Sequence, residues 1–227
     1  MNDILLVFAK VPRPGDVKTR LTPFLTPREA ARLYDAFLRD ALALYAQLEA
    51  NVRLYLAPPL PDDGLGDVPD RISVHEQRGE GLGPRMAHAF EAAFRDGGDR
   101  VAVVGTDHPT LPLSHLRRGF EALDGEPAVC IGPSEDGGFY LLGMSAFYPQ
   151  LFADMTYSHG DVFTDTLARI GATDAELTVL PQWYDVDTPE AMARMIADLR
   201  ETDVDAPRTR RAVERLALDD LVDSENR

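Results

Sequence analysis

The sequence is poor in lysine, in cysteine and in long apolar runs. One cysteine, Cys130, is present, which excludes an intrachain disulfide and is typical of a reducing compartment. Its apolar neighbours at 128, 129 and 131 predict a buried structural thiol. No run approaches the ~20 apolar residues of a membrane span, and the apolar run near the start is short for a signal sequence and lacks a basic leader. We therefore expect a cytoplasmic protein without a membrane span.

Positive charge is also scarce. The 227 residues carry 38 acids against 23 lysines and arginines, a formal net charge of −15. Such a field repels phosphate backbones, which argues against nucleic-acid or anionic-membrane binding, so any anionic ligand requires a local cluster of cations. An acidic surface with almost no lysine further predicts a halophilic protein adapted to high salt.

The only two lysines, Lys10 and Lys18, flank one loop. The unbroken apolar run at 4–9 predicts a strand buried on both faces, and the loop after it also contains Arg13 and Arg20. We expect these four cations to bind nucleotide phosphates, with a solvated cationic loop as the alternative. The loop is not a P-loop, because Val17 stands where the second glycine is needed.

Strand and helix patterns alternate along most of the chain. Thr26 and Glu29 form a predicted capping box with Pro27 at the first helical position, and further strand and helix patterns follow to about residue 200. This alternation predicts an α/β fold with a mainly parallel sheet that binds ligands at the carboxyl ends of its strands. We predict one domain over residues 1–200, and a charged helix or tail over 201–227 with a surface helix near 211–221.

Two aspartates follow predicted strands on this rim. Asp107 ends a strand that looks central, and alternation places Asp187 at the rim on the same face as Asp185. Asp107 and Asp187 together would form a divided carboxylate pair for one Mg²⁺ or Mn²⁺ ion. The alternatives are ordinary turn chemistry at 107–109 and a helix cap at Thr188.

Two glycine-rich segments complete the rim. Residues 132–140 contain Glu135 and Asp136, then Gly137 and Gly138, which predicts an acceptor site with Asp136 as general base; a simple hairpin turn is equally compatible. The other segment, with Gly81 and Gly83, is not a dinucleotide fingerprint, because proline replaces its third glycine at 84; it could still receive a base or ribose.

Five ordered motifs, at residues 8–21, 82–86, 105–111, 135–140 and 185–190, together resemble the radical-SAM/selenodomain-associated transferase family, within the GT-A nucleotide-diphospho-sugar transferase superfamily. The first motif is also similar to that of 2-phospho-L-lactate guanylyltransferases. The resemblance implies a three-layer α/β/α sandwich, phosphate binding by Lys18 and Arg20, and metal binding by Asp107 and Asp187. The sequence departs from the family at His108 and at 156–160.

These patterns predict a metal-dependent transferase that uses a nucleotide or nucleotide-sugar and an unknown acceptor, with Lys18 and Asp136 in catalysis. The leading form is glycosyl transfer from a nucleotide-diphospho-sugar. The alternative is nucleotidyl transfer from a nucleoside triphosphate to an acceptor phosphate with release of pyrophosphate. A module that binds nucleotide without turnover remains a third possibility.

Overall fold

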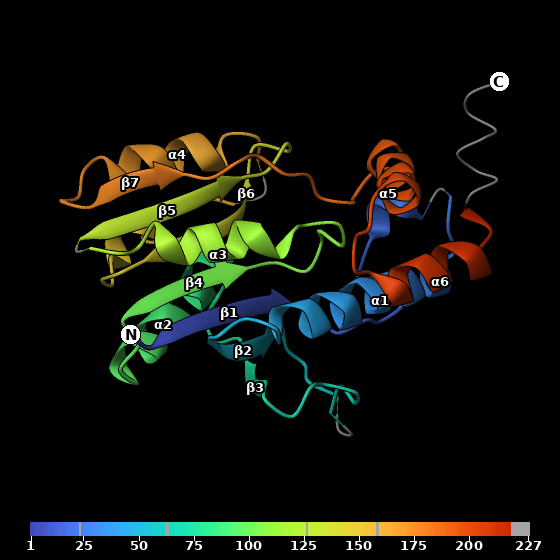
Figure 1. Ribbon diagram of the computed structural model, residues 1–227, viewed down its shortest axis with the longest axis horizontal. Coiled ribbons are helices and arrows are strands. Elements are labelled where there is room, and N and C mark those ends of the chain that lie inside the picture. Colours follow the sequence, from blue (N-terminus) through green and yellow to red (C-terminus); the bar gives the residue numbers. More distant parts are fainter. Residues whose placement is uncertain (23, 62–63, 126, 158, 219–227) are drawn as a thin grey trace.

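A computed structural model describes residues 1–22, 24–61, 64–125, 127–157 and 159–218. Its centre is a seven-stranded sheet in the order β3-β2-β1-β4-β6-β5-β7 (Figure 1). Neighbouring strands are parallel except that β6 runs antiparallel to β4 and β5. The strands are β1 (Asp3–Ala9), β2 (Asn51–Leu56), β3 (Ser73–Glu76), β4 (Arg100–Val104), β5 (Ala128–Pro133), β6 (Phe139–Met144) and β7 (Glu176–Val179).

Helices cover both faces of this sheet. One core cluster joins the sheet to α1 and α3, and a second joins its other face to α2 and α4. The predicted three-layer α/β/α architecture with a mainly parallel sheet is therefore confirmed. The helices are α1 (Pro27–Tyr45), α2 (Leu82–Arg95), α3 (Leu113–Glu121), α4 (Val162–Ile170), α5 (Pro189–Glu201) and α6 (Pro207–Arg215), with short 3-10 turns η1 (Thr19–Leu21) and η2 (Pro149–Leu151).

The start of α1 confirms the predicted capping box. The Thr26 hydroxyl accepts the Glu29 N–H at 3.3 Å, and the Glu29 carboxylate accepts the Thr26 N–H at 2.8 Å. Two otherwise unpaired backbone donors are satisfied in this way, so the helix begins at a fixed place. That place matters because α1 carries Tyr34 beneath the loop between β1 and η1.

The last described helix lies earlier than predicted. We expected a surface helix at 211–221, but α6 spans Pro207–Arg215, and residues 219–221 lie outside the described part of the chain. The reason is a long-range cap: the buried Asp40 of α1 accepts the backbone N–H groups of Arg208 at 3.1 Å and Thr209 at 2.7 Å. With α1 and α5, α6 forms a third core cluster. A domain boundary at residue 200 remains a prediction.

Two smaller expectations are also settled. Cys130 is buried within β5, and burial raises the pKa of its thiol to about 12, as suits a structural residue. Residues 134–138 connect the antiparallel strands β5 and β6, so the hairpin alternative is correct for the shape of that segment. None of the helices in the described residues has the length and apolar character needed to cross a membrane.

Candidate functional site

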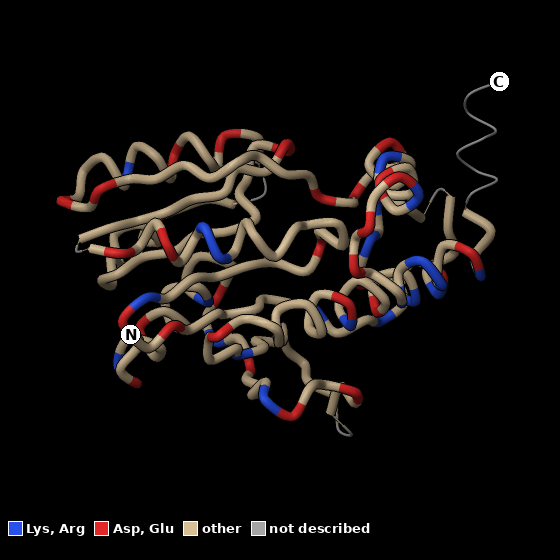
Figure 2. The backbone as a smooth tube through the Cα atoms, viewed as in Figure 1, with Lys and Arg blue, Asp and Glu red and all other residues tan. Residues whose placement is uncertain are grey.

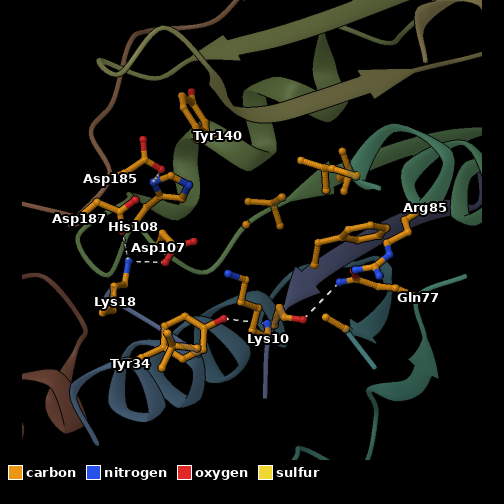
Figure 3. Close-up of a pocket in the computed structure, with 18 of the residues that line it drawn as sticks. Lys10, Lys18, Tyr34, Gln77, Arg85, Asp107, His108, Tyr140, Asp185 and Asp187 are labelled. Carbon is orange, nitrogen blue, oxygen red and sulfur yellow. Dashed lines mark hydrogen bonds and ion pairs between the residues drawn. The ribbon is translucent and has the colours of Figure 1, made fainter. Parts of the chain in front are cut away.

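A cavity of about 600 Å³ opens at the carboxyl ends of the parallel strands (Figure 3). Because β6 is antiparallel to β4, its first residues meet the same edge. Asp107, Asp185 and Asp187 lie together on one side of this cavity with Lys18, whereas Lys10 and Arg85 lie away from them. Its polar and charged lining consists of Lys10, Asp16, Lys18, Thr19, Arg20, Tyr34, Gln77, Arg85, Asp107, His108, Tyr140, Asp185 and Asp187.

Lys18 lies between the two predicted metal ligands. Its ammonium contacts the Asp107 carboxylate directly and lies 2.8 Å from Asp187 Oδ1, with only 2% of the side chain exposed. Burial would lower the pKa of Lys18, but the two carboxylates outweigh it and hold the pKa above its ordinary value. Desolvation likewise raises the pKa of Asp107, yet the charge of Lys18 prevails and lowers it. Lys18 and Asp107 are therefore both ionised.

A backbone contact brings the two aspartates together. Asp107 follows β4, the middle strand of the sheet, and its carbonyl accepts the N–H of Val186 at 3.0 Å. Thr188 then caps α5 through the N–H of Ala191, which fixes the end of the segment. Carboxylates 80 residues apart in sequence thus converge on one ammonium, as expected for loops at the same edge of a sheet.

The backbone of Lys18 is strained. It has a left-handed conformation, with φ 49° and ψ 38°, which a residue with a side chain rarely adopts. Its carbonyl accepts the N–H of Leu21 at 2.9 Å and starts the η1 turn. Strain of this kind, of order 1–3 kcal/mol, persists only where surrounding contacts fix it. Here the two carboxylates fix the ammonium in place.

A third carboxylate, Asp185, lies beside this pair. It accepts a hydrogen bond from the Ser134 hydroxyl and lies 3.2 Å from Nδ1 of the buried His108. Burial raises the pKa of Asp185 to about 6. Nδ1 of His108 is also 3.2 Å from the Tyr184 carbonyl; because both neighbours are acceptors, Nδ1 carries a hydrogen. His108 therefore orients Asp185.

The remaining predicted cations occupy different positions. Lys10 and Arg20 are exposed and line the cavity, whereas Arg13 does not belong to its wall. The backbone N–H of Lys10 donates to the Tyr34 hydroxyl at 3.0 Å, and that hydroxyl is 3.0 Å from Thr106 Oγ1. Tyr34 thus connects the backbone of Lys10, after β1, to the loop after β4 that carries Asp107.

Gln77 and Arg85 form the far end of the cavity. The Gln77 amide donates to the carbonyls of Ala9 and Tyr55 at 3.2 and 2.9 Å, so it joins β1 and β2 at their carboxyl ends. Its oxygen faces Arg85 Nη1 at 3.4 Å, and Arg85 Nε donates to the Gly79 carbonyl. The donors that Arg85 retains are available to a ligand.

The two predicted glycines of this region do not line the cavity. Gly81 precedes α2 with φ 92°, so it serves the turn. A side chain at Gly83 would approach the Tyr157 ring to 2.7 Å, so glycine is needed there for packing. The neighbours Leu82, Arg85 and Met86 reach the cavity in their place.

The turn at 134–138 also stands outside the cavity wall. Glu135 pairs with Arg194 at 2.8 Å, and Asp136 accepts the Gly138 N–H at 2.9 Å and so stabilises its own turn. A Cβ on Gly137 would collide with the backbone of Gly160. The acceptor-binding and general-base roles of these residues therefore remain predictions.

A family model matches residues 41–159, more than half of the chain. The family is described as "Uncharacterized protein conserved in bacteria (DUF2064)". The chain belongs to the DUF2064 family. The residues that match the family model include β4 and Asp107, whereas Lys18 and Asp187 lie outside them.

Other comparisons extend over nearly the whole DUF2064 chain. A crystal structure of a candidate nucleotide-diphospho-sugar transferase from Desulfovibrio desulfuricans G20 is 32% identical, covers 95% of this chain and 97% of its own, and superposes with a TM-score of 0.84. The 2-phospho-L-lactate guanylyltransferase of Halorubrum lacusprofundi is 27% identical over 86% of this chain and 85% of its own length. That of Methanocaldococcus infernus is 25% identical over 80% and 79%.

These matches confirm the predicted superfamily fold but not the predicted family label. The matched family is DUF2064, and the curated relatives are guanylyltransferases rather than radical-SAM-associated glycosyltransferases. At 13% identity, 4-diphosphocytidyl-2C-methyl-D-erythritol synthase still superposes with a TM-score of 0.57, which extends the same fold to a more distant protein.

The donor set of the DUF2064 site suits a divalent ion bound together with a substrate. Asp107 and Asp187 converge on one cation, yet among the described residues no group of three or more acidic, histidine or cysteine side chains is arranged to hold a metal. Mg²⁺ commonly takes one or two protein carboxylates and completes its shell with water and phosphate oxygens. The pair therefore fits a substrate-borne ion better than a permanent metal centre.

Sequence reasoning missed several residues of this site. Tyr34 lies on the face of α1 that looks like ordinary core, and Gln77 carried no signal apart from its position before a glycine-rich turn. Arg85 and Asp185 both stood inside motifs that we singled out, but neither received a role. Gln77 is a polar residue that follows a predicted strand, as Asp107 does. The same rule that singled out Asp107 would therefore have identified Gln77.

Proposed function

We propose that the protein is a nucleotidyltransferase that transfers a nucleoside monophosphate from a nucleoside triphosphate to a phosphorylated acceptor. An acceptor phosphate oxygen would form a bond to the α-phosphorus, the α–β phosphoanhydride bond would break, and pyrophosphate would leave. The observation that carries the proposal is the Asp107–Lys18–Asp187 cluster at the strand ends, beside the exposed Lys10 and Arg20. Enzymatic nucleotidyl transfer also agrees with the names of the curated relatives.

The cations of the cavity would have different roles. Lys10 and Arg20 are exposed at the cavity and would bind the triphosphate through charge-assisted hydrogen bonds. Lys18 is already paired, so its role would be to hold Asp107 and Asp187 in place and to approach phosphate only if a carboxylate turns away. This assigns the phosphate contact chiefly to Lys10 and Arg20, whereas we expected Lys18 to bind phosphate as well and to take part in catalysis.

Asp107 and Asp187 would hold Mg²⁺ or Mn²⁺ brought by the triphosphate. When bound, the ion would neutralise charge on the phosphates and favour departure of pyrophosphate. The carboxylates' own contribution is their fixed spacing around Lys18 and the backbone bond from Val186 to Asp107.

The remaining wall would receive the base. Phe8, Leu82 and Met86 offer apolar surface, and Arg85 offers hydrogen-bond donors beside it. Donors match the O6 and N7 acceptors of guanine, whereas the corresponding edge of cytosine presents a donor. We therefore propose a preference for GTP over CTP.

No general base is needed for this reaction, because an acceptor phosphate is already ionised near neutral pH. A sugar or alcohol hydroxyl would need one, and Asp136 would have to leave its turn to provide it. The position of Asp136 therefore favours a phosphate acceptor.

Product analysis tests the proposal. The protein would be incubated with GTP, CTP, ATP or UTP, with Mg²⁺ or Mn²⁺, and with a panel of small phosphorylated carboxylic acids that includes 2-phospholactate. We expect pyrophosphate release that requires both the acceptor and the metal. Absence of pyrophosphate with every acceptor, while a nucleotide binds tightly, would instead support the non-catalytic module.

Glycosyl transfer is a second candidate because of one observation. The protein from Desulfovibrio desulfuricans, at 32% identity and almost full coverage, is described as a nucleotide-diphospho-sugar transferase. Sugar nucleotides in the same assay would then release a nucleoside diphosphate and no pyrophosphate. The two reactions are distinguished by this product alone.

A further inference from the structure

A second cavity, of about 1010 Å³, lies between α1, α6 and the connections that follow β1 and β2. We call it the arginine groove. Its lining includes small residues, Ala31, Ala36 and Ala212, and the two prolines Pro12 and Pro14. Its basic residues are Arg28, Arg32 and Arg39 on α1 and Arg208, Arg211 and Arg215 on α6.

The two helices bring these guanidinium groups together. Because Asp40 caps the start of α6, this shorter helix lies beside part of α1 (Figure 1). Basic segments mark α6 and the adjoining part of α1 in Figure 2. Such a cluster of six arginines is unusual for a chain with a net charge of −15.

Two of the six arginines have partners within the groove. Arg39 pairs with Asp35 at 3.1 Å, and Arg208 pairs with Asp67 at 3.2 Å. Of the other four, Arg28, Arg211 and Arg215 are exposed and make no hydrogen bond or ion pair with any residue that the structure describes. Arg32 is exposed as well, and its charge acts on the nearby Glu29 carboxylate. The groove thus presents unpaired donors from both helices.

This arrangement is unfavourable without a ligand. Arg28 and Arg32 repel each other at i,i+4 on α1, and Arg211 and Arg215 do so on α6. Arg28 also lies in the first turn of α1, where the helix dipole disfavours a cation. A bound anion would relieve all three of these repulsions.

The lining also indicates the class of anion. Guanidinium groups bind phosphate oxygens in pairs of hydrogen bonds, and the alanines in the lining leave room for a compact group. No aromatic side chain lines the groove among the described residues, so a nucleobase would have no stacking partner. We propose that the arginine groove is a binding site for a compact polyphosphate-bearing ligand without a base, separate from the candidate active site.

Tripolyphosphate is a suitable probe, measured by calorimetric titration with EDTA present so that no metal contributes. The experiment uses the full chain carrying Lys10→Ala, which removes one exposed cation from the first cavity. Adding Arg28→Gln and Arg211→Gln removes one unpaired cation from each helix, and we expect the affinity for tripolyphosphate to fall at least tenfold. The matched control adds Arg117→Gln and Arg118→Gln, which removes two exposed arginines from α3.

Ionic strength is held constant at about 0.1 M, where screening acts over about 10 Å. An unchanged affinity in the groove variant would overturn the proposal. An equal loss in the control would also overturn it, since the loss would then come from the net charge of the protein and not from the groove. A glutamate-rich peptide of matched charge that binds more tightly than tripolyphosphate would overturn the assignment to phosphate. None of these outcomes depends on nucleotidyl transfer.

Discussion

The two cavities differ in whether their positive charges are buried and paired, although one loop lines both. Lys10 and residues 16–20 line the first cavity, and Val11, Pro12 and Pro14 line the arginine groove. In the first, Lys18 is buried and paired with two carboxylates, so folding has already fixed it. In the groove, Arg28, Arg211 and Arg215 are exposed without partners in the described structure. Burial and pairing therefore distinguish a cation that stabilises the fold from a cation that is available to a ligand. The residue type, lysine or arginine, distinguishes them less.

The largest expected effect comes from removing the paired cation. Lys18→Met leaves the stem but places two uncompensated carboxylates beside each other, so we expect a loss of about 3 kcal/mol in the free energy of unfolding, measured by urea denaturation. Lys10→Met is the matched control, since Lys10 is exposed and is the only other lysine; its effect should stay within about 0.5 kcal/mol. Equal effects of the two substitutions would remove the distinction between the two kinds of cation.

Removing one carboxylate should affect activity more than folding. Asp107→Asn keeps the shape of the side chain but loses its charge toward Lys18 and toward a metal ion, so we expect kcat/KM for pyrophosphate release to fall at least about 100-fold. Asp16→Asn is the control, because Asp16 lines the same cavity and makes no ion pair in the described residues. Activity that survives in Asp107→Asn would refute the metal-binding role.

His115 is a buried titratable side chain that lies behind the wall of the first cavity. It packs edge-on against Tyr140 and Trp183, and neither ring nitrogen has a partner in the described structure. Burial lowers the pKa of His115, so the unfolded chain takes up a proton first and stability is lost as pH falls below about 6.5. His115→Phe should therefore gain about 1 kcal/mol at pH 5.5 and less at pH 8.

The measurement is thermal or urea unfolding at the two pH values, with His88→Gln on the exposed side of α2 as control for loss of an imidazole. A gain that is equal at both pH values would show that packing rather than protonation is responsible.

The smallest effect has the opposite sign to that of Lys18. Arg28→Gln relieves repulsion from Arg32 and from the dipole of α1, so the protein without ligand should be more stable by about 0.5 kcal/mol. Arg117→Gln on α3 should change stability less. Destabilisation by Arg28→Gln would mean that Arg28 contributes to the fold, and would weaken the contrast between the two cavities.

Local rules predicted the framework of the site well. Thr26 and Glu29 form their capping box because both partners lie within one helical turn, and apolar runs identified the buried strands β1 and β4. The carboxyl-end rule predicted Lys10 and Asp107 at one rim, and both line the first cavity. These features depend on neighbours in sequence or on general topology.

The pairing inside the site could not be predicted in this way. Lys18 meets Asp107 and Asp187 because the Val186 N–H binds the Asp107 carbonyl, a contact between segments far apart in sequence. The packing at two glycines also depends on distant residues: a side chain at Gly83 would meet Tyr157 and one at Gly137 would meet Gly160, and no local pattern connects these pairs. The start of α6 similarly depends on Asp40 in another helix.

The only tryptophan of the chain gives this site an optical reporter. Trp183 bridges to Ser134, stacks on Tyr184 with ring centroids 5.8 Å apart, and stands two residues before Asp185. Its emission therefore comes entirely from the segment that leads to Asp185 and Asp187. Nucleotide, metal and acceptor binding can each be followed by the fluorescence of the unlabelled protein, with one fluorophore and no correction for others of its kind.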